Sequence, residues 1–212
     1  MEMKYLSVAE LSDLTASKSA APGGGSISAM AGAFAASLVC MVAKLTEGKK
    51  GYEAVSARMK EMDTQTEALR LSLLDDIQRD SSSFDAFMEA LSKPKTTEEE
   101  KAVRAAAMQG ALKGACRIPR QVAEKALEVL SLAVEAVSKG NANAASDGLV
   151  GAFTARAAVL GALSNVRINL AGIKDQDFVD KLTAECDEME QRARAAEKDV
   201  DLLMREKTAG AS

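Results

Sequence analysis

The sequence predicts an all-α protein, built as an up-and-down bundle of long helices in one domain spanning residues 1–212. Apolar residues recur at helical spacing along nearly the whole chain, and no segment shows the two-residue alternation of a strand. The composition agrees, because 47% of the residues are hydrophobic but only 3% are aromatic, and there are three prolines. A core made mainly of Ala, Leu, Val and Met favours closely packed helices.

The N-terminal half is predicted to contain three helices. Ser7, with Glu10 three residues later, forms the capping-box pattern that begins a short first helix. A glycine loop at residues 23–25 follows, and an Ala-rich helix then covers residues 26–47. The segment EGKKGYE breaks that helix, and a long amphipathic helix covers residues 53–91.

The C-terminal half is predicted to contain three more helices. The segment SKPKTTEEE forms a turn, and Thr97 is the expected N-cap of the next helix. Pro119 is expected to bend that helix, because proline removes a backbone donor. The segment SKGNANAASDG makes the next break, and helices at residues 144–170 and 177–204 complete the chain.

Net charge and hydropathy limit which binding partners and which cellular location we expect. The net charge of −4 provides no positive field for a polyanion, so we expect no nucleic-acid partner. The N-terminus lacks the apolar core of a signal peptide, and no run of residues is expected to be long enough to span a bilayer. We therefore expect no membrane partner and a cytoplasmic location.

The chain contains no histidine, which excludes the Ser/His and Cys/His nucleophile pairs and the usual zinc ligand sets. The three cysteines, Cys40, Cys116 and Cys186, match no metal or redox spacing and are expected to be buried thiols. We expect no metal site. Any proton transfer must use Asp, Glu, Lys, Tyr or water.

Three consecutive glycines lead into the Ala-rich helix and need a local reason, because glycine loses the most backbone entropy on folding. Glycines at a helix N-terminus leave its backbone N–H groups open to an anionic ligand, but neither nucleotide-binding glycine pattern is present. Ser28, Gly32 and Ala36 then repeat every fourth residue, which also permits close helix packing. Packing and ligand binding both remain open.

The helix at residues 144–170 carries a narrow stripe of small residues with polar residues at both ends. The stripe consists of Asp147, Gly151, Thr154, Ala158, Gly161, Asn165 and Asn169. It suits either a ligand groove or a hydrogen-bonded seam between two helices.

Two further groups could carry chemistry. Asp76 and Asp80 lie one helical turn apart, and carboxylates beside apolar residues can exchange protons near neutral pH. The alternative is that both are solvated surface groups. The segment GKKGY offers Lys49, Lys50 and Tyr52 to the carboxylates of a substrate, or simply forms a wet surface.

Five segments together resemble the cyclodeaminase/cyclohydrolase family of folate one-carbon enzymes. That family includes the C-terminal half of formiminotransferase-cyclodeaminase and stand-alone bacterial methenyltetrahydrofolate cyclohydrolases. The resemblance extends over residues 8–205. The segments are APGGGSISAMAGAFAASLVCMV, LTEGKKGYE, RDSSSFDAFMEALSKPKTTEEEKAVR, AMQGALKGACRIP and GNANAASDGLVGAFTARAAVLGALSNVRINL.

The resemblance implies an all-helical homodimer whose substrate is a tetrahydrofolate derivative, with no metal, nucleotide or redox cofactor. Asp80 corresponds to the catalytic aspartate of the family, and Asp147 is the reserve acid or base. The resemblance implies a folate-contacting stretch at residues 106–114, with Gln109 and Lys113 as candidates, and further site positions at Gly24, Gly25, Ser26, Asn165 and Asn169. Lys49 and Tyr52 are added as candidate substrate-binding residues on their side chains alone.

Two reactions fit this resemblance. The first is ring closure of formiminotetrahydrofolate to methenyltetrahydrofolate with loss of ammonia, in which Asp80 supplies a proton to the leaving group. The alternative is hydrolysis of methenyltetrahydrofolate to formyltetrahydrofolate, in which the same aspartate acts as the base. A third reading, weaker because Asp80 is present, is a folate-binding helical protein without catalysis.

Overall fold

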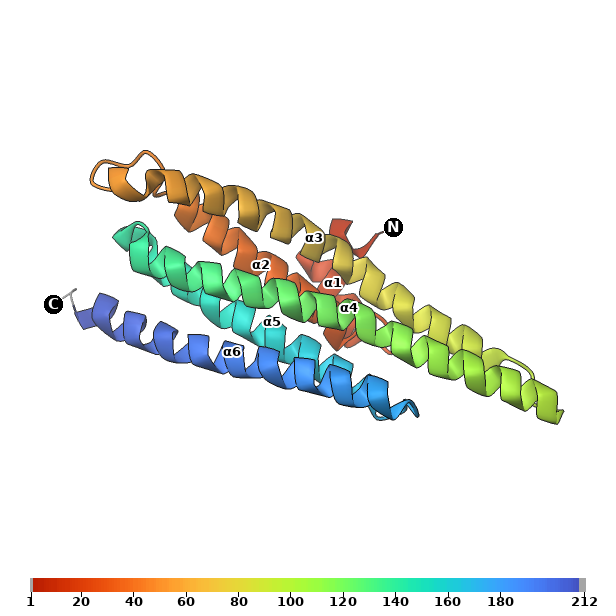
Figure 1. Ribbon diagram of the computed structural model, residues 1–212. Coiled ribbons are helices and arrows are strands. Elements are labelled where there is room, and N and C mark those ends of the chain that lie inside the picture. The colour runs from red at the N-terminus through yellow and green to blue at the C-terminus, as the bar shows by residue number, and fades with distance from the viewer. Residues whose placement is uncertain (1, 210–212) are drawn as a thin grey trace.

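In the computed structural model, which describes residues 2–209, the chain forms six α-helices, two short 3-10 turns and no strand (Figure 1). The α-helices are α1 (Val8–Ala16), α2 (Gly24–Lys44), α3 (Glu53–Ser92), α4 (Glu98–Lys139), α5 (Ala145–Leu170) and α6 (Gln176–Ala209). The 3-10 turns are Met3–Tyr5 and Ala142–Ala144. The all-α prediction is confirmed, and the helices lie close to their predicted ranges, with differences of a few residues at the ends of α2 and α6.

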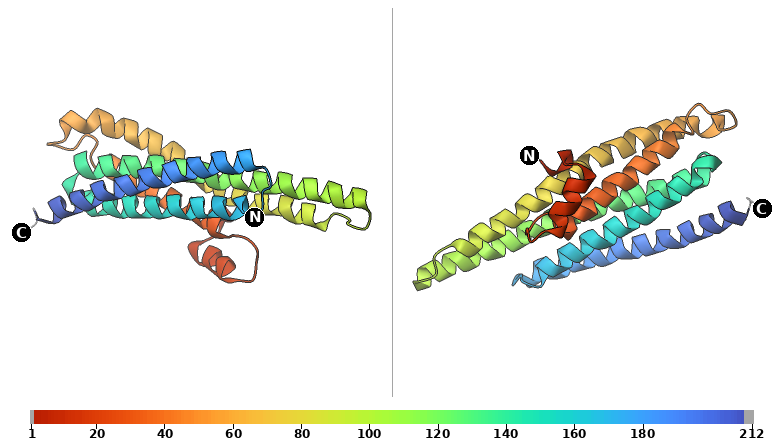
Figure 2. Two further views of the ribbon diagram at one scale, coloured as in Figure 1. Left: turned by 60° about the horizontal axis from the view of Figure 1, so that its bottom comes forward. Right: turned by 180° about the vertical axis from the view of Figure 1, so that it is seen from behind.

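Helices α2, α3, α4 and α5 form the bundle, and α6 packs along α4 and α5 (Figure 1). The short helix α1 lies to one side of this bundle, and the chain then returns to begin α2 (Figure 2). The ends of α3 and α4 continue past the other helices as an antiparallel hairpin (Figure 1).

Local capping sets two of the helix starts as predicted. The Ser7 hydroxyl accepts the backbone N–H of Glu10, whose carboxylate accepts the backbone N–H of Ser7 at 2.8 Å. Thr97 and Glu100 form the same capping box at the start of α4. Pro119 lies buried inside α4, and the helix continues through it to Lys139.

Small residues let α2 and α5 approach closely. A Cβ added at Gly161 would lie 2.5 Å from the Ser28 hydroxyl, and one added at Gly151 would lie 3.4 Å from the Leu38 Cβ. Ala158, between these two glycines, is fully buried. The middle of the α5 stripe is therefore a helix seam, which was one of its two predicted roles.

Two helical segments, Gly24–Lys44 and Ala142–Leu170, are long and apolar enough to cross a membrane by length and composition. The expectation that no run has this length was wrong. Their apolar windows are 61% and 50% buried in the bundle, because α2 and α5 supply much of the core.

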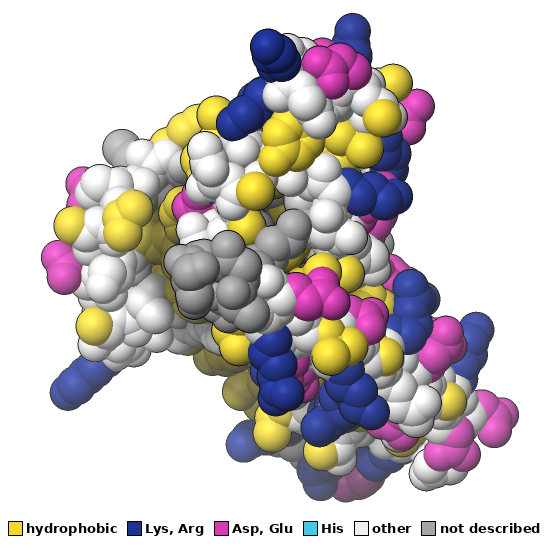
Figure 3. Space-filling model, turned by 90° about the vertical axis from the view of Figure 1, so that its left-hand side faces the viewer, with side chains coloured by type: hydrophobic (Ala, Val, Ile, Leu, Met, Phe, Trp, Pro, Cys, Tyr) yellow, Lys and Arg dark blue, Asp and Glu magenta, His cyan; other side chains and the backbone are white. Residues whose placement is uncertain are grey.

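Several large side chains that α2 and α5 expose to solvent are also apolar. The exposed apolar side chains include Phe34 and Met41 on α2, Leu45 directly after it, and Val150 and Phe153 on α5. Figure 3 views the molecule from its left-hand end in Figure 1 and shows charged side chains gathered mainly on the right of that view. Charge is thus unevenly distributed around the bundle.

Candidate active site

The glycines belong to helix α2 itself and do not form a loop before it. Gly23 is the N-cap, and Gly24 and Gly25 lie in the first turn, two residues earlier than the predicted start. Within residues 2–209, positive φ angles occur only at Gly48 and Gly51. An unusual backbone conformation therefore does not explain the glycines at the start of α2.

Close approach by side chains from α3 and α5 does explain two of these glycines. A Cβ on Gly25 would lie 2.6 Å from the Asp80 Cγ, much less than any real contact allows. A Cβ on Gly24 would lie 3.0 Å from the Asn165 Nδ2. Because consecutive Cα atoms are about 3.8 Å apart, the carboxylate and the amide meet the α2 backbone at neighbouring points.

Asp80 caps the N-terminus of α2 from another helix. No side chain next to this terminus in sequence caps it. Instead, the Ser26 hydroxyl donates to the Asp80 Oδ2 at 2.8 Å, and the Ser26 backbone N–H donates to the same carboxylate. The positive end of the helix dipole also favours a carboxylate at this position.

The two aspartates on α3 have different surroundings. Burial raises the pKa of the Asp80 carboxyl above its ordinary value of 3.8, the hydrogen bonds from Ser26 oppose that rise, and the charge of Asp76 adds slightly to it. Asp76 is fully buried and forms ion pairs with Lys125 and, at 2.6 Å, with Arg79. Asp76 therefore holds α3 against α4, and Asp80 alone of the pair is turned toward open space.

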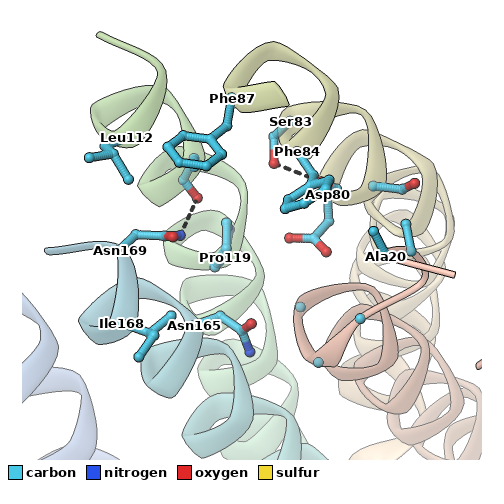
Figure 4. A pocket seen from close by; sticks show the side chains of 16 residues that line it. Ala20, Asp80, Ser83, Phe84, Phe87, Leu112, Pro119, Asn165, Ile168 and Asn169 are labelled. Atoms are coloured by element: carbon cyan, nitrogen blue, oxygen red, sulfur yellow. Dashed lines mark hydrogen bonds between the residues drawn. The ribbon is translucent and has the colours of Figure 1, made fainter. Parts of the chain in front are cut away.

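That open space is a cavity of about 250 Å³ where α2, α3, α4 and α5 meet (Figure 4). Asp80 and Asn165 project into it from opposite sides. Residues 20–25, apart from Pro22, form one edge. The remaining lining residues are Ser81, Ser83, Phe84, Phe87, Leu112, Ala115, Pro119, Ile168 and Asn169. One carboxylate faces mostly apolar walls, which suits a ligand whose apolar group carries a positive charge.

The two asparagines of α5 are used differently. The Asn165 Nδ2 donates to the carbonyl of Gly161 in its own helix at 2.9 Å. Its Oδ1 accepts no hydrogen bond from the described residues, so it is available to a ligand or a water. The Asn169 Nδ2 donates to the carbonyl of Ala115 at 3.2 Å and so ties α5 to α4.

Gln109 and Lys113 do not line the cavity, although Leu112 and Ala115 of the same helix do. The Gln109 side chain donates to the Gly172 carbonyl at 2.9 Å and accepts the Lys174 backbone N–H at 2.7 Å. Lys113 pairs with Asp175 at 2.6 Å. Both side chains hold the loop between α5 and α6 against α4.

Lys49, Tyr52 and Asp147 lie at the opposite end of the bundle. The Lys49 Nζ donates to the Asn141 Oδ1 at 2.9 Å, and the Tyr52 hydroxyl accepts the Ala142 backbone N–H at 2.9 Å. Asp147 is in the first turn of α5, about 27 Å along that helix from Asn165. Within one chain the structure does not bring these three residues to the cavity.

Sequence reasoning missed most of the apolar wall. Phe84, Leu112, Pro119 and Ile168 line the cavity without having been predicted. Phe84 carried a readable signal, because it follows Asp80 by four residues and so shares its helix face. Leu112 lies within the stretch 106–114 that the resemblance implied to contact folate, although it was not singled out there. Leu112, Pro119 and Ile168 come from α4 and α5, and their position depends on how those helices pack.

Comparison with known proteins gives consistent matches. The sequence profile described as formiminotransferase-cyclodeaminase matches residues 7–188. Methenyltetrahydrofolate cyclohydrolase of Methylorubrum extorquens is 42% identical over 169 residues, covering 80% of this chain and 81% of that protein. Formimidoyltransferase-cyclodeaminase of Gallus gallus is 38% identical over 76% of this chain, which spans only 30% of that longer protein.

The fold also has a solved counterpart. The crystal structure of formiminotetrahydrofolate cyclodeaminase from Thermotoga maritima superposes with a TM-score of 0.86 at 32% sequence identity. The superposition covers 96% of this chain and 98% of that one, so all the long helices take part in it.

Proposed function

The chain belongs to the formiminotransferase-cyclodeaminase family, and from this premise we propose that it hydrolyses methenyltetrahydrofolate to formyltetrahydrofolate. The observation that carries the proposal is the half-buried Asp80 carboxylate, the only charged side chain among the residues that line a mostly apolar cavity. The carbon that reacts in this substrate lies between two ring nitrogens and carries a delocalised positive charge. A carboxylate in a poorly hydrated site attracts such a cation more strongly than water does.

The reaction needs one proton acceptor beside that carbon. Water forms a bond to the carbon while the ionised Asp80 carboxylate takes a proton from the water. The tetrahedral carbon then breaks one of its two C–N bonds, and the proton passes to the released nitrogen. One further proton leaves as the hydroxyl becomes the formyl carbonyl, so the proposed reaction consumes water and requires no metal or redox cofactor.

The surrounding residues fix the geometry of these steps. Ser26 orients the Asp80 carboxylate through its hydroxyl, which donates to Oδ2 at 2.8 Å, and through its backbone N–H. The Asn165 Oδ1 is positioned to accept a hydrogen bond from the attacking water or from the substrate ring. Phe84 and Phe87, with ring centroids 6.5 Å apart, offer aromatic surface to a flat ring system.

Ring closure of formiminotetrahydrofolate with loss of ammonia is the second candidate. It is favoured by the whole-chain likeness to the Thermotoga maritima cyclodeaminase and by the raised pKa of Asp80, because a protonated carboxyl can donate to departing ammonia. Hydrolysis is preferred because the 42% identical relative is a cyclohydrolase of comparable length. Hydrolysis, which the sequence left as the alternative to cyclodeamination, is therefore the better supported of the two reactions.

The test is a steady-state assay of the purified full chain with each substrate separately. We expect methenyltetrahydrofolate to be hydrolysed faster than the non-enzymatic rate at neutral pH. We expect formiminotetrahydrofolate to be converted at least about tenfold less efficiently, as judged by kcat/KM. Efficient release of ammonia with no acceleration of hydrolysis would overturn the first candidate in favour of the second.

The homodimer is part of the same proposal. An isologous dimer needs one self-complementary patch, and the exposed apolar side chains of α2 and α5 provide it along two adjacent helices. Light scattering at micromolar concentration should give twice the mass of the chain. Phe34→Glu should shift the mass to that of a monomer, and a monomeric wild type would contradict this part.

A further inference from the structure

A second polar hollow lies on the outer side of α3 and α4, next to the cavity that contains Asp80. It has a volume of about 320 Å³. Its lining residues are Gln78, Arg79, Ser82, Ser83, Gly114, Arg117 and Ile118. Ser83 lines both this outer groove and the Asp80 cavity, so the two hollows adjoin at that side chain.

The outer groove contains a cation that has no ion-pair partner among the described residues. Arg117 is exposed, and no carboxylate of the described residues forms an ion pair with it. Arg79 lines the same groove, held by Asp76 at 2.6 Å and by the Gln121 side chain at 3.2 Å. Lys125 also pairs with Asp76, so two cations already share that carboxylate. No acidic residue lines the groove itself, so Arg79 and Arg117 give it a positive excess.

No side chain covers the surface of α4 beside Arg117, because residue 114 is glycine. Gly114 is exposed in the interior of α4, and a Cβ added there would meet no atom within 4 Å. Glycine disfavours a helix interior, so neither packing nor backbone geometry accounts for it. A side chain at residue 114 would project into the groove, three residues before Arg117 on the same helix face.

A neighbouring groove between α4 and α6 is a weaker candidate. It also contains Gly114 and Arg117, together with the exposed Lys181, but it shares no lining residue with the Asp80 cavity. Its other cations are already paired, Lys113 with Asp175 and Arg120 with Glu185.

We propose that the outer groove binds the glutamate carboxylates of the folate substrate, with Arg117 as the main contact and Arg79 as the second. This inference rests on the proposed function, because it places the anionic end of the same ligand whose cationic ring occupies the Asp80 cavity. The guanidinium groups suit carboxylates, which they bind through two parallel hydrogen bonds.

The test compares two substrates, methenyltetrahydrofolate and its pteroate analogue, which lacks the glutamate. Arg117→Gln should raise KM for the complete substrate by about tenfold or more and leave KM for the analogue unchanged. The kcat should stay the same with both. Gly114→Leu should have the same selective effect because it fills the groove, whereas Gly110→Leu should not, since Gly110 is equally open but lines neither hollow.

Lys181→Gln is the matched control for loss of a surface cation, and it should change neither KM. An unchanged KM in Arg117→Gln, or equal rises for both substrates, would overturn the inference. A selective rise in Lys181→Gln alone would place the carboxylates in the groove between α4 and α6. Conversion of both substrates by the wild type would establish the proposed function whatever these variants do, and conversion of neither would refute both proposals.

Discussion

Replacing Gly25 by alanine tests the proposed reason for the glycines at the start of α2. The added Cβ would lie 2.6 Å from the Asp80 Cγ, whereas ordinary contacts begin near 3.4 Å. Asp80 lies in the middle of the forty-residue helix α3, so its backbone cannot easily yield. The carboxylate must therefore move by about 1 Å, and displacements of that size in an active site can lower rates roughly a hundredfold.

The effect on stability should be small by comparison. Moving the carboxylate weakens the 2.8 Å bond from Ser26, and hydrogen bonds to charged groups contribute about 1.5–3 kcal/mol. Alanine is favoured over glycine in helices by up to about 1 kcal/mol, which offsets part of that loss. We expect a net loss of about 1–2 kcal/mol, which lowers Tm by several degrees.

The assay is kcat for methenyltetrahydrofolate, measured beside thermal melts of the same preparations. Gly110→Ala is the control, because a Cβ there meets no atom within 4 Å and should raise Tm slightly without changing kcat. If Gly25→Ala keeps wild-type kcat, then Asp80 does not depend on its contact with the α2 backbone, and the reasoning is wrong.

Three further changes probe neighbouring parts of the account. Ser26→Ala removes a hydrogen-bond donor that lowers the pKa of Asp80, so that pKa should rise. The acid limb of the pH profile of kcat/KM should then move to higher pH, and an unchanged limb would contradict the role of Ser26. Asn165→Leu should weaken folate binding about tenfold with little change in Tm; a large drop in Tm with normal binding would make Asn165 a packing residue. Arg58 holds the pKa of Glu135 at about 2, so the stability that their pair provides is complete above pH 4.5 and is lost as the pH falls toward 2. In urea unfolding, the difference between wild type and Glu135→Gln should shrink over that range, and a constant difference would exclude the pair as its cause.

Local signals in the sequence predicted the helices well. The capping boxes at Ser7 and Thr97 depend on contacts three residues apart, and hydrophobic periodicity depends on contacts three and four residues apart. The start of α2 was misplaced because its cap is Asp80, which lies 54 residues from Ser26 in the chain. No local pattern contains that information.

The candidate site also contains residues that the sequence could identify and residues that it could not. Asp80, Gly24, Gly25 and Asn165 do come together, as the family resemblance implied. Gln109 instead contacts the loop after α5, because periodicity identifies a helix face but not the element that covers it. Lysine and tyrosine side chains can bind a ligand or hold a loop in place equally well. Only the fold shows that Lys49 and Tyr52 do the second, through hydrogen bonds to Asn141 and Ala142.

The most direct test of the central claim is the kinetics of Asp80→Asn with methenyltetrahydrofolate. Asparagine keeps the shape of the side chain and an oxygen that can accept from Ser26, but it cannot take a proton from water. The account predicts a fall in kcat of about a hundredfold or more, with the dissociation constant of a folate ligand changed only severalfold. Wild-type kcat in this variant would contradict the account and remove Asp80 from the reaction.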